Sequence, residues 1–199
     1  MVSFEVAERG REPLRFSVGH GGVLVAGSRR RELSGLVCRS LVGGLGDAGF
    51  GFLVGCAGGV DKSFRRALAE SPYAERALVG CAFRSRVRAL SSYGLPALWV
   101  VPPGLSPKAA LRRRTLWLAK RCVMAVVFPL DPTTGTWGAG SRLAYRACLE
   151  QLKPVFVVCP EAPREADCYR VVRSCLYGVE GHWVVPHPVR VGGPCDDEF

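Results

Sequence analysis

The sequence predicts an α/β protein with a Rossmann-like fold, in which a mostly parallel sheet of about six strands carries helices on both faces. Short apolar runs alternate along the chain with segments of helical periodicity. These runs are continuous rather than alternating with polar residues, which indicates strands buried on both faces of a sheet. The 199 residues are 48% hydrophobic and 22% charged, so we expect one substantial core and a single core domain.

Six runs are long enough for a strand and too short for a buried helix. They lie at 23–26, 50–55, 77–83, 97–101, 123–128 and 155–159. Between them, helical periodicity gathers apolar residues on one face of each helix. One face comprises Leu33, Leu36, Val37, Leu41 and Leu45, and another comprises Ala144, Ala147, Cys148 and Leu152. The segment 82–92 stays open, because its alternating arginines suit either a strand or a loop.

Both ends of the chain lie outside this alternation. We expect an N-terminal extension over 1–21 that forms an extra strand or a hairpin, followed by a nucleotide-binding core over 22–160. The segment 161–199 is expected to begin with a helix around 164–176 and to end in an irregular tail. Within that tail, 183–185 could form a short strand, whereas its prolines and acidic close favour irregular structure.

Several classes of protein do not fit this sequence. No apolar run reaches the roughly 18 residues that a membrane helix needs, and the charged N-terminus lacks the apolar stretch of a signal peptide. We therefore expect a soluble, cytoplasmic protein without a membrane partner. The nine cysteines contain no C-x-x-C pair and are expected to be mostly buried apolar residues. The spacing of Cys168, Cys175, His182 and His187 matches no common zinc module, so we expect no metal.

The positive charge is concentrated after the expected strands. Lysine and arginine number 27 against 17 acidic residues, giving a net charge of +10, which favours polyanionic partners. Arginines cluster at 29–31 after the first strand, at 84–88 after the third, and at 112–114 in the helix after the fourth. Such clusters are usually solvated surface. Their convergence on one edge of the sheet predicts that at least one arginine contacts a ligand.

Two glycine-containing loops follow the first two strands, at the edge where parallel sheets bind ligands. Gly27, Ser28 and Arg29 supply a turn, a hydroxyl and a guanidinium that could hold a phosphate, although a Gly-Ser pair is as often a simple turn. Gly58 and Gly59 let the backbone approach a bulky anion. Asp61 suits either a helix cap or an acceptor for a ribose or base. The spacing fits neither the dinucleotide fingerprint nor the Walker A motif.

A third loop, rich in hydroxyl groups, follows the fifth expected strand. Thr134, Gly135 and Thr136 could hold a phosphate. A threonine in this loop could equally cap the following helix. Three such loops at one sheet edge favour the ligand site. The expected ligand is a nucleotide or a nucleotide-derived molecule, with no cofactor assigned.

The ordered motifs resemble the SLOG superfamily over roughly 22–160. They are V-L-V-A-G-S-R, G-C-A-G-G-V-D, A-A-L-R-R-R and V-V-F-P-L-D-P-T-T-G-T, followed by a helix and K-P-V-F-V-V. The chain looks most similar to small SLOG proteins and to the Rossmann-like core of DNA-processing protein A, and more distantly to Lonely Guy phosphoribohydrolases. This resemblance implies a Rossmann-like fold that binds nucleotides or single-stranded DNA. It carries site roles to Gly27, Ser28, Arg29, Gly58, Gly59, Asp61, Arg112, Arg113, Gly135 and Thr136.

One departure from the resemblance argues against catalysis. Lonely Guy enzymes carry a catalytic Glu shortly after their Gly-Thr loop, where this chain reads W-G-A-G-S at 137–141. Hydrolysis of an N-glycosidic bond needs such a group unless Asp61 replaces it. We therefore expect non-catalytic nucleotide binding, with nucleotide hydrolysis as a lesser alternative.

The other alternative is binding of single-stranded nucleic acid. The charge and arginine clusters favour it, and Trp99, Trp117, Trp137 and Trp183 are candidates for stacking on bases. Most of these tryptophans, Trp99 above all, are equally expected in the core. A homo-oligomer, or a subunit role in a larger assembly, is compatible with either kind of binding.

Overall fold

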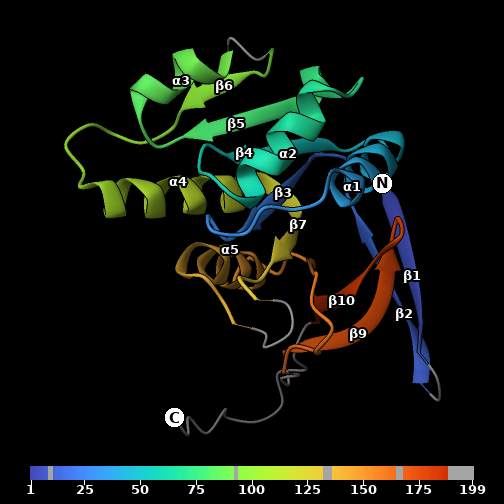
Figure 1. Ribbon diagram of the computed structural model, residues 1–199. Coiled ribbons are helices and arrows are strands. Elements are labelled where there is room, and N and C mark those ends of the chain that lie inside the picture. The colour runs from blue at the N-terminus through green and yellow to red at the C-terminus, as the bar shows by residue number, and fades with distance from the viewer. Residues whose placement is uncertain (9–10, 92–93, 132–135, 165–167, 188–199) are drawn as a thin grey trace, which may run out of the picture.

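An eight-stranded sheet forms the centre of the computed structural model, which describes residues 1–8, 11–91, 94–131, 136–164 and 168–187 (Figure 1). Its strand order is β6-β5-β4-β3-β7-β8-β10-β9. The first six of these strands are parallel, and β10 and β9 extend the sheet in antiparallel fashion. The Rossmann-like α/β fold that the sequence predicts is therefore confirmed.

All six predicted strands are present. They are β3 (Gly22–Gly27), β4 (Gly51–Gly55), β5 (Ala77–Cys81), β6 (Ala97–Trp99), β7 (Cys122–Phe128) and β8 (Val155–Val157). Their continuous apolarity reflects burial on both faces. Alternate residues of β3 illustrate this, because Val23 and Val25 pack on one face of the sheet while Leu24 and Ala26 pack on the other.

Two layers of helices cover the sheet (Figure 1). Helices α1 (Gly35–Asp47) and α2 (Val60–Ala69) pack on the face of Val23 and Val25. Helices α4 (Pro107–Arg121) and α5 (Ala139–Leu149) pack on the opposite face. A 3-10 turn, Ala74–Arg76, precedes β5. The open segment 82–92 forms a short helix, α3 (Arg84–Ser91), beside β5 and β6.

The residues of the two predicted apolar helix faces are buried or half-buried, except for one exposed leucine in each face. Leu41 and Leu45 are fully buried, but Leu36 is 70% exposed. The buried stripe of α1 includes Cys38, Leu41, Val42 and Leu45, and Leu36 lies off this stripe. Leu152 is 72% exposed because α5 ends at Leu149 and Leu152 lies in the left-handed turn before β8.

The expected N-terminal hairpin is present. Strands β1 (Val2–Glu8) and β2 (Arg11–Val18) pair antiparallel and lie beside the C-terminal strands (Figure 1). Phe4 and Phe16 are stacked, and each ring also contacts the buried Trp183, with centroid separations of 5.2 and 4.9 Å. Aromatic contacts therefore join the hairpin to the main sheet.

The helix predicted around 164–176 is wrong. Tyr169–Leu176 forms strand β9, which pairs with β10 (Val179–Pro186). Tyr177 and Gly178 join them with φ of 49° and 80°, as a two-residue type I′ hairpin requires. Val172 and Leu176 are buried and four residues apart, a spacing that suits a strand of period two as well as a helix. The irregular structure favoured for the segment after 176 is also wrong over Val179–Pro186, which forms β10; the alternative of a strand at 183–185 is correct. The predicted tail beyond 187 lies outside the described residues.

Six of the nine cysteines are buried apolar residues, as expected: Cys38, Cys56, Cys81, Cys122, Cys148 and Cys159. Cys168 and Cys175 are exposed. None of the helices in the described part of the chain combines the length and the hydropathy that crossing a bilayer demands.

We predict that replacing leucine by alanine has very different effects at two positions of α1. Leu45→Ala should lower the free energy of unfolding by about 2–5 kcal/mol, because it removes a fully buried side chain and leaves a cavity. Leu36→Ala should change it by about 0.5 kcal/mol or less, since Leu36 is 70% exposed. Urea denaturation of both variants checks this. Equal losses would contradict the observed packing face.

Candidate functional site

Three loops meet beyond the carboxyl end of β3, at the centre of the sheet. The backbone N–H of Val60 donates to the Ser28 carbonyl at 3.1 Å, which ties the second loop to the first. A β-carbon added at Gly58 would lie 3.5 Å from the Arg29 carbonyl oxygen, and one added at Gly138 would lie 3.8 Å from the Ser28 hydroxyl. The loops that the sequence singled out therefore adjoin one another around Ser28 and Arg29.

Gly59 is required by the geometry of this junction. Its φ is +59°, and a β-carbon there would lie 2.2 Å from the Ser28 carbonyl oxygen. Gly59 is also the N-cap of α2, without a side-chain hydrogen bond to the helix. The N-terminus of α2 thus presents its backbone N–H groups and positive dipole end next to Ser28 and Arg29, an arrangement suited to an anion.

The second loop is held by a buried ion pair. Asp61 is 5% exposed, and its Oδ2 accepts hydrogen bonds from the Ala57 N–H at 3.2 Å and from Arg114 Nη1 at 3.3 Å. Asp61 therefore does not cap α2, and its inward-facing carboxylate is occupied by protein groups. Gly55 makes room for the pair, because a β-carbon there would lie 2.2 Å from Asp61 Oδ2 and 2.3 Å from Arg114 Nη1.

Other buried or half-buried groups support the same loop. Arg65 Nη1 donates to the carbonyl oxygens of Gly55 at 2.6 Å and Ala57 at 2.9 Å. Burial lowers the pKa of the Arg65 guanidinium, and Asp61 offsets part of that effect. A hydrogen bond from the Cys81 thiol lowers the pKa of Cys56 to about 5, with further help from Arg114 and the Ala82 N–H. Arg65 and Arg114 therefore stabilise the conformation of this loop.

In the first loop, Ser28 is buried and Arg29 and Arg30 are exposed. Ser28 is 6% exposed, and its hydroxyl accepts from the Arg30 N–H at 3.1 Å, so it forms a local turn. Gly27 packs against Val60, where a β-carbon would lie within 2.5 Å of the valine side chain. Arg29 and Arg30 are exposed. These two guanidinium groups are free to reach a ligand at the loop junction.

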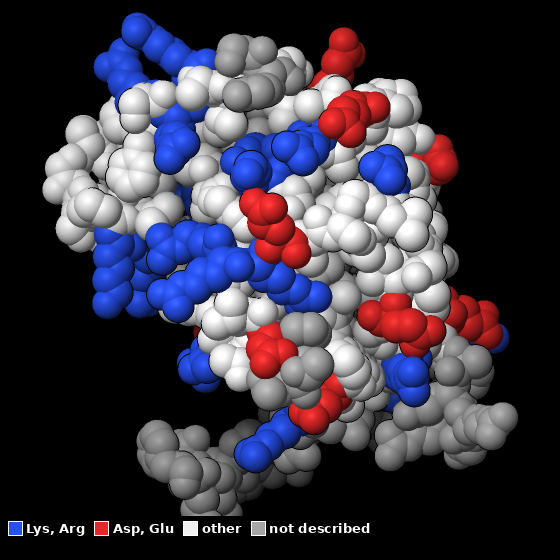
Figure 2. All heavy atoms as spheres, in the orientation of Figure 1, with Lys and Arg blue, Asp and Glu red and all other residues white. Residues whose placement is uncertain are grey.

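The arginine run of α4 is divided in the same way. Arg114 is buried against Asp61, whereas Arg112 and Arg113 are exposed. The contact of Arg114 places this turn of α4 beside the carboxyl end of β4. Figure 2 shows lysine and arginine side chains gathered over α4 and α5, with another group over α3.

The last loop is described in part. Thr134 and Gly135 lie outside the described residues. Thr136 is exposed, and its carbonyl oxygen accepts from the N–H groups of Leu130 at 2.8 Å and Asp131 at 3.3 Å. The N-cap of α5 is Gly138, so Thr136 does not cap that helix. Across the described residues, no group of three His, Cys, Asp or Glu side chains is arranged to hold a metal ion.

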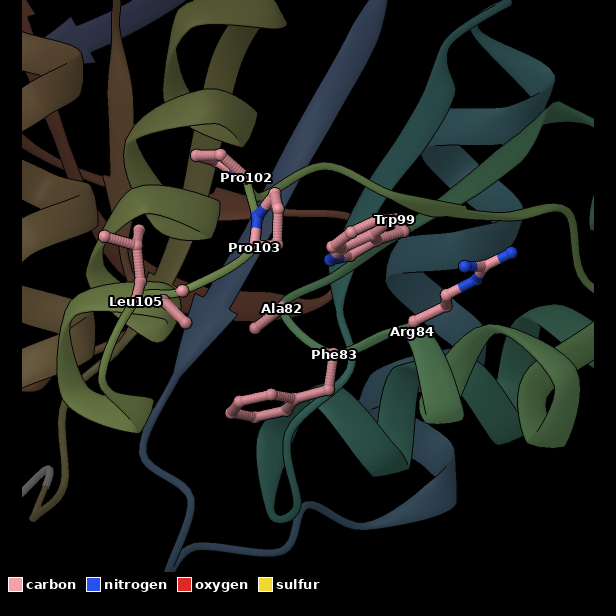
Figure 3. Close-up of a pocket in the computed structure, with 9 residues that line it drawn as sticks. Ala82, Phe83, Arg84, Trp99, Pro102, Pro103 and Leu105 are labelled. Atoms are coloured by element: carbon pink, nitrogen blue, oxygen red, sulfur yellow. The ribbon is translucent and has the colours of Figure 1, made fainter.

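An aromatic pocket of about 150 Å³ at the ends of β5 and β6 was not predicted from the sequence (Figure 3). Trp99, expected in the core, is half-buried and forms one wall. The lining residues are Ala82, Phe83, Arg84, Trp99, Pro102, Pro103, Gly104, Leu105 and Ala110. Phe83 and Trp99 lie at the carboxyl ends of neighbouring strands, and this placement could have indicated the pocket from the sequence.

Comparison with solved structures identifies DNA processing protein A (DprA) as similar in fold. The protein from Streptococcus pneumoniae has a TM-score of 0.55 and 20% identity over 71% of this chain and 51% of that protein. The protein from Helicobacter pylori, described for its single-stranded DNA binding mode, has a TM-score of 0.51 and 16% identity over 73% of this chain and 67% of that protein. The chain thus spans about half the length of the first.

No protein-family model and no curated protein matches the chain. At these identities the structural likeness shows a shared Rossmann-like fold. The resemblance to the SLOG superfamily and the domain boundaries at 21 and 160 remain predictions.

Two neighbouring glycines should respond differently to alanine. Gly59→Ala should lower the free energy of unfolding by about 2 kcal/mol or more, because of its positive φ and the 2.2 Å approach to the Ser28 carbonyl oxygen. Gly58→Ala should cost less than about 1 kcal/mol, because its β-carbon would make an ordinary contact at 3.5 Å. Thermal and chemical denaturation measure both. A neutral Gly59→Ala would refute the tight junction.

Removing one partner of the buried ion pair should be costly. Asp61→Asn leaves the Arg114 charge buried without its carboxylate and should lower the free energy of unfolding by about 3–5 kcal/mol. The matched control is Glu32→Gln, which removes the carboxylate of the exposed Lys62–Glu32 pair and should cost less than about 1 kcal/mol. Similar losses for the two variants would show that the buried pair does not hold the loop.

Proposed function

We propose that the chain binds single-stranded nucleic acid, without catalysis, along the carboxyl edge of the sheet. The observation that carries this proposal is the spread of exposed guanidinium groups across several strands. Exposed arginines follow β3 at 29–30, follow β5 at 84–88 and lie on α4 at 112–113. From β3 to β6 the edge spans three strand spacings, about 14 Å, which exceeds the reach of one phosphate.

The second support is the position of the aromatic pocket relative to the glycine loops. Backbone phosphates of a strand would lie at the junction of Arg29, Gly58 and the α2 N-terminus. A base of the same strand could then reach Trp99 and Phe83 two to three strands away. Stacking of a base on an aromatic side chain contributes about 1–3 kcal/mol and tolerates any base. The pocket, at about 150 Å³, has room for about one ring system.

The comparisons support the same class of ligand. The similar H. pylori structure concerns a protein that binds single-stranded DNA. Absence of catalysis is proposed because the carboxylate that could have served a hydrolase, Asp61, is engaged by Arg114 and the Ala57 N–H.

A free nucleotide is the second candidate, favoured by Gly58, Gly59 and the N-terminus of α2, which has no side-chain cap. A nucleotide that binds only the folded state stabilises it by RT ln(1 + [L]/Kd), so the thermal midpoint rises with the logarithm of the nucleotide concentration. A panel of nucleoside phosphates and cyclic dinucleotides that leaves the midpoint unchanged, while oligonucleotides raise it, would select the first candidate.

We predict that affinity for a fluorescent thymidine oligonucleotide falls steeply with salt, with a log–log slope near 0.7 for each phosphate neutralised. Arg29→Ala and Arg113→Ala should each weaken binding roughly tenfold by removing a charge-assisted hydrogen bond. Arg121→Ala is the matched control for Arg113, because Arg121 ends the same helix at the amino end of β7. It should bind as wild type. Absent or salt-insensitive binding would overturn the proposal.

A further inference from the structure

A second cavity, of about 250 Å³, lies between the end of β8 and the β9–β10 hairpin. Its lining includes Arg31, Cys159, Gly181 and His182, together with the exposed ion pair of Arg173 and Glu180. Arg31 belongs to the same loop as Arg29 but extends across the end of β7, where its Nη1 donates to the Pro129 carbonyl at 2.9 Å. The cavity therefore opens at the same sheet edge as the loop junction, on the side away from the aromatic pocket.

Arg31 is a partly buried cation without a carboxylate partner within ion-pair distance among the described residues. Its guanidinium lies over the Phe128 ring at 5.8 Å, and the Pro129 carbonyl engages one nitrogen. Burial lowers the pKa of this guanidinium, and Cys159 and Asp131 offset that effect in part. Arginine remains charged in proteins and has five N–H donors, so the cavity contains a desolvated cation with donors to spare.

His182 supplies a hydrogen-bond acceptor to the same cavity. It is 5% exposed, and its Nδ1 lies 3.0 Å from the Cys159 carbonyl oxygen. Because a carbonyl only accepts, Nδ1 carries the proton, and burial lowers the pKa of the ring, which keeps it neutral. Nε2 is therefore an acceptor. Gly181 allows this placement, since a β-carbon there would lie 2.4 Å from the Val157 carbonyl oxygen.

We infer that this cavity is a second phosphate subsite for the bound strand, in which Arg31 holds a phosphate and His182 accepts from a neighbouring sugar or base. The inference rests on the proposed function and extends the path of the strand beyond β3. From β3 to the gap between β8 and β10 the edge spans two to three strand spacings, about 10–14 Å. Phosphates of one strand are ~3.4 Å apart along the axis of a duplex and further apart in an extended strand. A trimer has only two internal phosphates and falls short of this span, whereas an octamer covers it.

Strand length tests the inference. Binding of thymidine oligonucleotides of three and eight residues is measured for the wild type, Arg31→Gln and Arg121→Gln. Arg31→Gln should weaken binding of the octamer roughly tenfold and lower the salt slope of that binding by about 0.7. Binding of the trimer should be unchanged. Arg121→Gln removes the same charge at the opposite edge of the sheet and should leave both unchanged. Arg31→Lys keeps the charge and should retain the salt slope.

The outcomes separate the two proposals. If the wild type binds neither oligonucleotide, the proposed function fails and the subsite fails with it. If the wild type binds both, and Arg31→Gln binds the octamer as tightly as wild type, the subsite alone is refuted. An equal loss for trimer and octamer also refutes it, because Arg31 would then act through the shape of the first loop. If Arg31→Gln does not fold, His182→Gln is tested in its place. Weaker binding of the octamer with an unchanged salt slope supports the subsite. Octamer binding as tight as that of the wild type refutes it.

Discussion

The buried ion pair between Asp61 and Arg114 is the interaction on which the geometry of the sheet edge depends. It joins the first turn of α2 to the middle of α4, helices on opposite faces of the sheet, through the space that Gly55 leaves at the end of β4. A buried pair of this kind contributes little net stability, yet losing one partner is costly. The pair therefore favours one relative position of the second loop and the two helices.

Fixing that loop determines how the remaining positive charge is used. Arg65 and Arg114 are engaged by carbonyl oxygens and by Asp61, so they shape the loop from within. Arg29, which adjoins this loop, and Arg113, which follows Arg112 on α4, are exposed. A loop held in this way, next to the helix N-terminus and the exposed Arg29, is preorganised for phosphate, because little conformational entropy is lost when the ligand binds.

The sequence predicts the strands of the parallel sheet because continuous apolar runs reflect burial on both faces. It does not predict β9, in which Val172 and Leu176 satisfy helical and strand periods alike. The loops of the candidate site were located to the correct strand ends. The role of Asp61 could not be predicted, because its partner Arg114 is 53 residues away in the sequence. No local sequence pattern indicates a contact between helices on opposite faces of a sheet. The pocket of Phe83 and Trp99 depends likewise on the pairing of β5 with β6.

The proposed function places a single strand along the carboxyl edge of this sheet. Its most direct test is photo-crosslinking of a thymidine octamer substituted with 5-iodouracil, followed by mass spectrometry of the crosslinked peptides. Binding along this edge should give crosslinks in the peptides that contain Phe83, Trp99 and the loop 28–31. Crosslinks confined to 71–76 and 149–154, which precede β5 and β8 at the opposite edge, would contradict it.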